Sequence, residues 1–357
     1  MTKPLSTLPD IDRLETRAVL KQLVAAHRYL AELKGIAATI PNPEILINTL
    51  SLQEAKDSSE IENIFTTQDE LYQAEIFAGA SKNPAAREVR RYAAALRHGF
   101  DRMRNDRLIT INRIIDFHRT LMDNDVGIRK LPGTVIKNQA SGETIFTPPQ
   151  DPNDIQTLLA DLERFINDDT VSAADPLIKM AIAHHQFESI HPFYDGNGRA
   201  GRILNSLYLV AKGMLDQPVL YLSGYVIDTK ADYYRLLQST RETRDWEPWL
   251  LYIIKGVETT SMTTIRLIKA IGNLMTEYEE RIRRDLPKIY SYELLTNLFR
   301  HPYTKIEAVQ NDLGVSRLTA SKYLSALVEK KFVEKFRFGK YNYYVNPPLM
   351  RIFENEH

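Results

Sequence analysis

Cysteine is absent from the 357-residue sequence. Its absence excludes disulfide bonds, a catalytic thiolate and a cysteine-bound zinc ion, and it fits a reducing compartment. Excess charge is absent as well, because 46 lysines and arginines balance 46 aspartates and glutamates. With no net charge, any attraction to nucleic acid or to a membrane surface would have to be local.

Long apolar runs are also missing. No stretch approaches the ~20 residues that cross a bilayer, and the N-terminal sequence turns polar too early for a signal peptide. Hydrophobic residues make up 43% of the chain and charged residues 26%, as in ordinary globular proteins. We therefore expect a soluble, cytoplasmic protein of two or three domains without a membrane partner.

Helical periodicity covers most of the chain. Apolar spacing and capping residues predict helices over residues 12–34, 44–58, 85–103, 110–122, 152–166, 176–189, 199–212, 230–241 and 246–282. Gly35 is a natural stop for the first helix. Two short β-rich runs, 134–137 and 144–147, flank a polar turn and predict a β-hairpin. The expected fold class is mainly α, a helical core with a small hairpin.

The composition shifts after residue 284. Residues 286–346 contain ten lysines and arginines against five aspartates and glutamates. The pattern here is helix, helix, turn, helix and β-hairpin, which is typical of a winged helix-turn-helix. Its predicted helices cover 290–299, 305–314 and 318–331, and its two β-rich runs meet at Gly339 and Lys340. We predict three domains: an N-terminal helical region at 1–105, a catalytic core at 106–284 and a winged helix-turn-helix at 285–357.

The densest chemistry lies at 191–202, HPFYDGNGRAGR. Asp175 and Pro176 form a good N-cap and first position for the helix that leads into the motif, and an apolar helical run follows it. The motif is therefore a turn between two helices. Gly196 and Gly198 can adopt conformations that other residues resist. Backbone N–H groups at the start of the second helix then favour an anion.

Charged side chains in the motif suit a polyphosphate. Arg199 and Arg202 are three apart and would share one face of the second helix. Asp195 is acidic in cationic surroundings, which fits a Mg²⁺ ion that bridges phosphates. The imidazole of His191 titrates near neutral pH and could take a proton from an attacking hydroxyl.

Other interpretations of these residues remain open from the sequence. Taken singly, a histidine before proline, an Arg-x-x-Arg pair or an Asp-Gly-Asn-Gly turn is usually structural. A calcium loop would need alternating oxygen ligands and a terminal glutamate, which the motif lacks. A zinc site at His184, His185 and His191 lacks the usual spacing, so His184 and His185 are better interpreted as core or supporting groups.

The motif resembles the signature of the Fic family, His-Pro-Phe-x-Asp-Gly-Asn-Gly-Arg-x-x-Arg. The matching residues are His191, Pro192, Phe193, Asp195, Gly196, Asn197, Gly198, Arg199 and Arg202. The hairpin that ends in FTPPQ is similar to the family's flap, and YLSGYVIDTKADYYRLLQ and DWEPWLLYI resemble the segments that follow it. The N-terminal helices and the winged-helix tail resemble the domain arrangement of bacterial members, so the resemblance covers most of the chain.

This resemblance implies that the protein transfers AMP from ATP to a serine, threonine or tyrosine hydroxyl of a target protein and releases pyrophosphate. His191 would be the general base, Asp195 would hold Mg²⁺ across the α- and β-phosphates, and Arg202 would bind the γ-phosphate. The residues implied to bind the nucleotide are Glu62, Asp195, Gly196, Asn197, Gly198, Arg199, Ala200, Gly201, Arg202 and Tyr233. Relatives that phosphorylate their targets have an altered Gly-Asn-Gly-Arg segment, which is intact here.

Two further segments gain roles from the resemblance. Ile136 and Lys137 in the flap would bind the target peptide by strand addition. Tyr233 would line the nucleotide pocket, with core packing as its alternative. Arg241 stands where some relatives have an asparagine, so the asparagine's contact with adenosine is not expected there.

The sequence SSEIEN at 58–63 matches the family's inhibitory pattern Ser/Thr-x-x-x-Glu-Gly/Asn through Ser58, Glu62 and Asn63. Glu62 could form a bidentate pair with Arg202 and hold it away from the γ-phosphate. Alone the pattern is weak, because a helix cap on the surface is its usual explanation. In some relatives the equivalent glutamate also positions water for removal of AMP, so that reverse activity is compatible with the pattern.

A competing function is a DNA-binding regulator. Ser316 would cap a recognition helix that carries Arg317 and several lysines, and the wing within 286–346 would bring further cations to phosphates. Winged helices also serve as protein docking or dimerisation modules. The expected partners are thus ATP, a protein target that could be the protein itself, DNA in the competing case, and a second copy in a homodimer.

Overall fold

The structure is a computed structural model of the whole chain. It describes residues 11–40, 42–67, 70–71, 83–137, 141–338 and 341–354. The predicted junction at Gly339 and Lys340 lies outside these residues. No described helix is both long and apolar enough to span a membrane.

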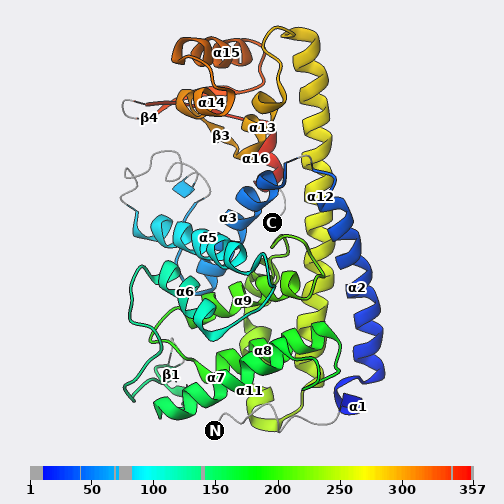
Figure 1. Ribbon diagram of the computed structural model, residues 1–357, viewed down its shortest axis with the longest axis vertical. Helices are drawn as coiled ribbons and strands as arrows, with labels where there is room; N and C mark the ends of the chain where they lie inside the picture. Colours follow the sequence, from blue (N-terminus) through cyan, green and yellow to red (C-terminus); the bar gives the residue numbers. More distant parts are fainter. Residues whose placement is uncertain are drawn as a thin grey trace.

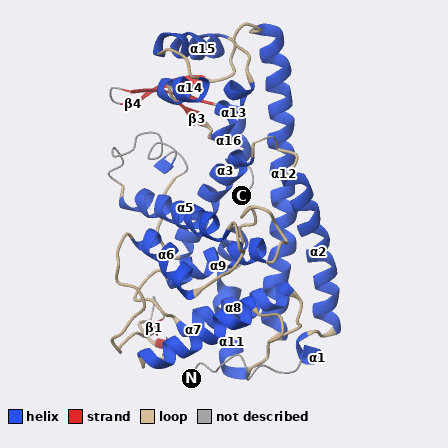
Figure 2. Ribbon diagram, in the orientation of Figure 1, coloured by secondary structure: helices blue, strands red, loops and turns tan. Residues whose placement is uncertain are grey.

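Helices make up most of the molecule (Figure 2). Those before the hairpin are α1 (Ile11–Leu14), α2 (Arg17–Ala37), α3 (Pro43–Ile61), α5 (Pro84–Met103) and α6 (Ile111–Met122). After the hairpin of β1 (Ile136–Lys137) and β2 (Thr144–Phe146) follow α7 (Pro152–Asn167), α8 (Pro176–Ile190), α9 (Asn197–Ala211), α10 (Ser223–Asp228), α11 (Lys230–Thr243) and α12 (Glu247–Asp285). Every helix that we predicted in this part is present, and α10 was not predicted.

The first predicted helix was wrong in two respects. It is split, because Thr16 has extended backbone and its hydroxyl accepts a hydrogen bond from Val19 N at 3.3 Å, which starts α2. Gly35 does not end α2, which continues to Ala37. A glycine inside a helix costs only about 1 kcal/mol, and the packing of α2 along α12 outweighs that cost.

The long helix α12 is the axis of the molecule. Its 39 residues run from the half that contains α8 and α9 to the C-terminal part, and α2 lies beside it (Figure 1). The helices α7, α8 and α11 lie toward one end of the molecule, and the C-terminal elements lie at the other. The two parts therefore share one continuous helix instead of being joined by a flexible linker.

The C-terminal part contains the predicted elements in the predicted order. They are α13 (Tyr292–Arg300), β3 (Tyr303–Thr304), α14 (Ile306–Leu313), α15 (Arg317–Glu329), β4 (Glu334–Phe338), β5 (Tyr341–Val345) and α16 (Pro347–Glu354). The short strand β3 and the helix α16 were not predicted. The antiparallel sheet has the order β3-β5-β4, and its side chains pack on α3 through Leu52.

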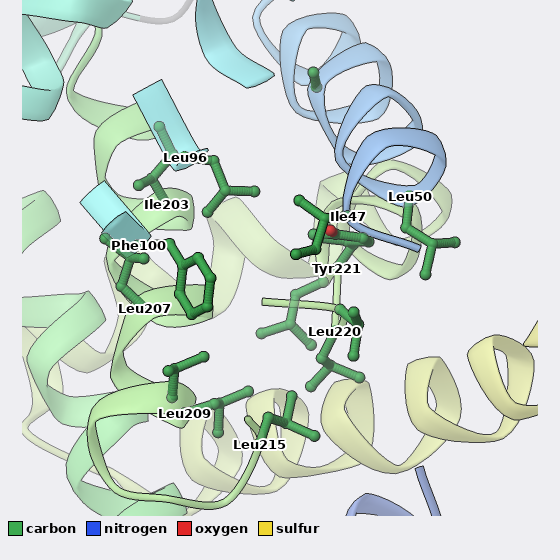
Figure 3. Packing of buried hydrophobic residues seen from close by; sticks show 14 of the residues in the cluster. Ile47, Leu50, Leu96, Phe100, Ile203, Leu207, Leu209, Leu215, Leu220 and Tyr221 are labelled. Carbon is green, nitrogen blue, oxygen red and sulfur yellow. The ribbon is translucent and has the colours of Figure 1, made fainter. Parts of the chain in front are cut away.

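The helices α3, α5 and α9 meet in the hydrophobic core (Figure 3). Leu96 and Phe100 of α5 lie close to Ile203 and Leu207 of α9, and all four side chains are buried. In the adjoining helix α8, every residue from Leu177 to Ile190 is buried. The polar side chains of α8 are therefore forced into the interior, next to the turn that follows it.

Candidate active site

The motif residues lie in the turn between α8 and α9. His191 caps the C-terminus of α8 in a left-handed conformation, with φ 49° and ψ 59°. Gly196 caps the N-terminus of α9 and is also left-handed, with φ 76°. Between them, Phe193 N donates to Asn197 Oδ1 at 2.8 Å, and Asn197 Nδ2 donates to Phe193 O at 2.9 Å. These two hydrogen bonds close the loop and fix its conformation.

The imidazole of His191 is neutral at pH 7. Burial, together with the positive charges of Arg241 and Arg129, lowers its pKa to about 4. Within the described chain, its buried Nδ1 makes no hydrogen bond of normal geometry. A neutral imidazole is the form that can accept a proton, as a general base must.

The first turn of α9 is built to approach a negatively charged group. No side chain caps this N-terminus, so the helix dipole and the first N–H groups favour an anion there. A Cβ built on Gly198 would overlap Glu62 Oε1 and would lie 3.1 Å from Arg202 Nη1. The carboxylate of Glu62 therefore occupies the space that glycine leaves open.

Arg202 is the central cation of this turn, and it is only 3% exposed. Its Nη2 donates to Glu62 Oε1 at 2.8 Å, so the predicted pair is present. We had expected a bidentate pair, but only one hydrogen bond joins the two side chains. Nη2 also donates to Ser58 O at 2.9 Å, and Nε donates to Ser58 Oγ at 2.8 Å. The guanidinium is thus shared between the end of α3 and the residue one turn before it.

Arg199 has a different partner. Its Nη1 donates to Glu88 Oε2 on α5 at 3.0 Å, and its Nη2 lies 3.6 Å from Met122 Sδ on α6. That Arg199 and Arg202 both serve a polyphosphate stays a prediction, and each guanidinium is paired with its own carboxylate here. Because α9 packs against α5 and α6 as well as against α3, the two guanidinium groups engage carboxylates on different helices.

Asp195 is exposed at the edge of the anion site. Its Oδ1 accepts a hydrogen bond from Gly196 N at 2.7 Å. His118 Nε2 lies 2.9 Å from Asp195 O and must carry a proton there, because a carbonyl oxygen only accepts. The described residues contain no cluster of three ligands that could hold a metal alone. One carboxylate beside a phosphate site nevertheless fits Mg²⁺, which takes the rest of its ligands from phosphates and water.

Polar groups of α8 support the turn from below. His184 Nε2 and Tyr233 Oη are 2.8 Å apart, and His185 Nε2 and Leu237 O are 3.1 Å apart. Burial lowers the pKa of both histidines to about 3, and it raises the pKa of Glu188 to about 7. Both histidines are buried core groups, as the sequence indicated.

Tyr233 belongs to the same buried layer. It is 2% exposed, and its ring centroid lies 5.7 Å from that of Trp249. This environment favours core packing, the alternative that the sequence left open for Tyr233.

The hairpin is tied to α8 by Arg241. Ile136 pairs with Phe146 and Lys137 pairs with Thr144, so the predicted flap residues lie on β1. The guanidinium of Arg241 lies 4.4 Å from the centroid of the Phe146 ring, and its Nε donates to Ser189 Oγ at 2.9 Å. Arg241, which stands where some relatives have an asparagine, therefore connects the hairpin with the helix that leads to His191.

Glu54, Glu88 and Arg129 are among the residues around the site that were not predicted. Glu54 Oε1 accepts hydrogen bonds from Tyr92 Oη at 2.8 Å and Ser223 Oγ at 2.5 Å, and burial raises its pKa to about 7. Its spacing, four residues before Ser58 and eight before Glu62, was a usable helical signal. Glu88 and Arg129 had no local signal, because their partners come from other helices.

The helical core, the closed turn and the uncapped start of α9 define a Fic-type domain. Residues 108–209 match the Fic/DOC family, residues 20–101 match the Fic/DOC family N-terminal region, and residues 274–349 match the C-terminal domain of SoFic-like protein adenylyltransferases. These three matches follow one another along most of the chain. The chain belongs to the Fic/DOC family.

Known proteins support the same assignment. Protein adenylyltransferase fic-1 from Caenorhabditis briggsae is 30% identical over 182 residues, which are 51% of this chain and 34% of the relative. Protein adenylyltransferase Fic from Drosophila erecta is 32% identical over 153 residues, 43% of this chain and 28% of the relative. The matched region thus spans about a third of the length of these curated relatives.

Solved structures share the fold. A Fic family protein from Desulfovibrio desulfuricans G20 superposes with a TM-score of 0.59 at 19% identity, over 92% of this chain and 96% of the other. Residues 134–508 of Fic-1 from Caenorhabditis elegans superpose with a TM-score of 0.55 at 22% identity, over 70% of this chain and 73% of the other. The first likeness extends beyond the catalytic core to nearly the whole chain.

Proposed function

We propose that this protein is a protein adenylyltransferase that is restrained by its own Glu62. The observation that carries the proposal is the arrangement at one turn. A neutral, left-handed His191 lies beside an uncapped helix N-terminus, and Arg202 is in the second turn of that helix. This arrangement suits a hydroxyl, a polyphosphate and a proton acceptor in one place. The curated relatives are named protein adenylyltransferases.

In the proposed reaction, a target hydroxyl oxygen attacks the α-phosphorus of ATP. The hydroxyl proton passes to the imidazole of His191, the bond to the bridging oxygen breaks, and pyrophosphate leaves with the electron pair. The N–H groups at 196–199 would bind phosphate oxygens, and Arg202 would bind the γ-phosphate. Asp195 would hold Mg²⁺, which supplies positive charge to the phosphates when bound.

The restraint follows from the contacts of Arg202. While its donors are engaged by Glu62 and Ser58, they are not available to a γ-phosphate. The Glu62 carboxylate also lies over Gly198, where a phosphate oxygen would approach the start of α9. Removal of AMP from a target by the same glutamate is a further activity of this proposal.

Label transfer tests the function directly. The Glu62→Gly variant is incubated with Mg²⁺ and ATP that carries ³²P either at the α- or at the γ-position. Adenylyl transfer predicts that protein is labelled only by the α-labelled nucleotide, and that His191→Ala in the same background removes the label. Labelling by the γ-position would instead identify a kinase, and mass spectrometry of a treated lysate would identify the target and the added group.

The C-terminal part is proposed as a docking unit instead of a DNA-binding one. Its sheet packs on α3 through Leu52, and Arg317, at the start of the predicted recognition helix, is already paired with Glu307 at 2.7 Å. Binding of the full chain to duplex DNA with a steep dependence on salt would support the regulator instead. The domain boundaries at residues 105 and 284 and a homodimer also remain proposals.

A further inference from the structure

Arg129 is a buried cation without a carboxylate partner among the described ion pairs. Its side chain is fully buried in the segment between α6 and β1, and burial lowers its pKa. Its Nη1 is also buried and makes no hydrogen bond within the described chain. Burial of a charge costs several kcal/mol unless it is well compensated. Stability alone is therefore a poor account of this residue.

The remaining donors of Arg129 hold the loop of the proposed base. Nε donates to His191 O at 2.8 Å, Nη2 donates to Ile190 O at 3.3 Å, and the backbone N–H donates to Pro192 O at 2.9 Å. Three consecutive carbonyl oxygens are thus fixed by one residue. The left-handed backbone conformation costs about 1–2 kcal/mol in a residue other than glycine. His191 therefore needs such support to keep its φ of 49°.

The same guanidinium holds the end of the hairpin. Nη2 also donates to the carbonyl oxygen of Pro149, in the segment between β2 and α7. The other foot of the hairpin is tied to this one, because Gly133 N donates to Gln150 Oε1 at 2.7 Å and Gln150 Nε2 donates to Thr134 O at 3.0 Å. One rigid, planar group therefore connects the proposed target-binding hairpin with the loop that orients His191.

We propose that Arg129 is a positioning residue, which sets the imidazole of His191 relative to the hairpin that receives the target. The proposal rests on the proposed adenylyl transfer. The charged groups around the imidazole are Arg129 itself, Arg241 from α11 and Glu62 from the end of α3. Arg129 thus contributes both alignment, through its planar fork, and a nearby positive charge.

Two substitutions separate these contributions in the Glu62→Gly background. Arg129→Lys keeps the charge but loses the fork, so kcat for transfer should fall about 10- to 100-fold, as expected for a misaligned base, with the Kd for ATP changed less than twofold. Arg129→Met also removes the charge, so the acid limb of the pH–kcat profile should move to higher pH. The control Lys130→Met removes an exposed neighbouring cation and should change neither quantity. Circular dichroism checks that each variant is folded.

A second measurement does not depend on activity. The titration of the His191 imidazole, followed by NMR in the full-length chain, should move to higher pH in Arg129→Met and stay in place in Lys130→Met. If the Glu62→Gly variant transfers no label from ATP to protein, the proposed adenylyl transfer is overturned, but the NMR titration still tests the role of Arg129. A folded Arg129→Lys variant with parental kcat, or an unmoved titration in Arg129→Met, would overturn the role of Arg129.

Discussion

Glu62 Oε1 lies 2.8 Å from Arg202 Nη2, although the two residues are 140 positions apart in the sequence. The contact joins the end of α3 to the second turn of α9. Ser58, one turn earlier on α3, accepts two more hydrogen bonds from the same guanidinium. Because three donor–acceptor pairs act on one buried arginine, the release of Arg202 should depend on the end of α3 as a unit.

Removal of the Glu62 carboxylate should activate the protein. A hydrogen bond between charged groups contributes about 1.5–3 kcal/mol, so we expect Glu62→Gly to raise α-label incorporation about 10- to 100-fold. Glu62→Gln keeps an acceptor but no charge, and its labelling should be intermediate. The matched control is Glu60→Gln on the same helix, which should be labelled to the same extent as the wild-type protein. Equal labelling of the wild-type protein and of Glu62→Gly would contradict the restraint.

Asn63 should matter because of its backbone. It is left-handed with φ 61°, and it ends α3 with hydrogen bonds from Asn63 N to Glu60 O and from Ile64 N to Ser59 O, a C-terminal motif that favours glycine or asparagine. Asn63→Val should loosen this end and raise labelling about 5- to 30-fold, since the left-handed conformation costs ~1–2 kcal/mol. Asn63→Gly removes the same side chain without strain and should label like the parent. If labelling rises equally in Asn63→Val and Asn63→Gly, the Asn63 side chain matters and its backbone conformation does not.

Two glycines should respond to alanine in opposite directions. A Cβ on Gly201 would lie 2.6 Å from Glu188 Oε1 and 3.2 Å from His184 Cε1, so Gly201→Ala should destabilise the fold by about 1–3 kcal/mol. A Cβ on Gly35 meets nothing within 4 Å, and α2 is helical there, so Gly35→Ala should stabilise it by about 0.5–1 kcal/mol. Urea unfolding measures both changes. An unchanged free energy of unfolding in Gly201→Ala would mean that α8 and α9 separate easily at this point.

Stability should fall in acid. Burial lowers the pKa of His184 and His185 to about 3 and of His191 and His301 to about 4, against 6.5 for the unfolded chain. Between these values the unfolded state binds protons that the folded state does not, so the free energy of unfolding decreases as pH falls below 6.5. Glu54 and Glu188 act in the opposite direction. Their folded pKa of about 7 exceeds 4.5, so their contribution is complete below pH 4.5 and is lost as pH rises toward 7.

Between pH 6.5 and 4.5 the four histidines lower the free energy of unfolding by more than the two glutamates raise it. We therefore expect the urea midpoint to fall as the pH is lowered from 6.5 to 4.5. The fall should be steeper just below pH 4.5, where the glutamates no longer oppose it. His185→Gln should make the decline shallower by at most one proton. A midpoint that stays constant from pH 6.5 to 4 would show that the buried histidines take up protons without unfolding.

Local signals in the sequence predicted the helices well, because a cap and an apolar period involve only neighbouring residues. Asp175 at the start of α8 and the left-handed Gly196 at the start of α9 are examples. Gly35 was misjudged, because the same residue stops a helix or continues it according to what packs beside it. Strand β3 was missed because it has only two residues, and its partner β5 lies about 40 residues further along the chain.

The order of the chemical groups in HPFYDGNGRAGR, and the four-residue spacing that puts Ser58 and Glu62 on one face of α3, can be read from the amino-acid sequence. The partners of these groups cannot, because they depend on how the helices pack. The tertiary structure gave Arg202 to Glu62, Arg199 to Glu88, and the carbonyl oxygens around His191 to Arg129. A guanidinium can donate to any well-placed oxygen. The choice among oxygens depends on which helices pack together, and that packing is a property of the whole core.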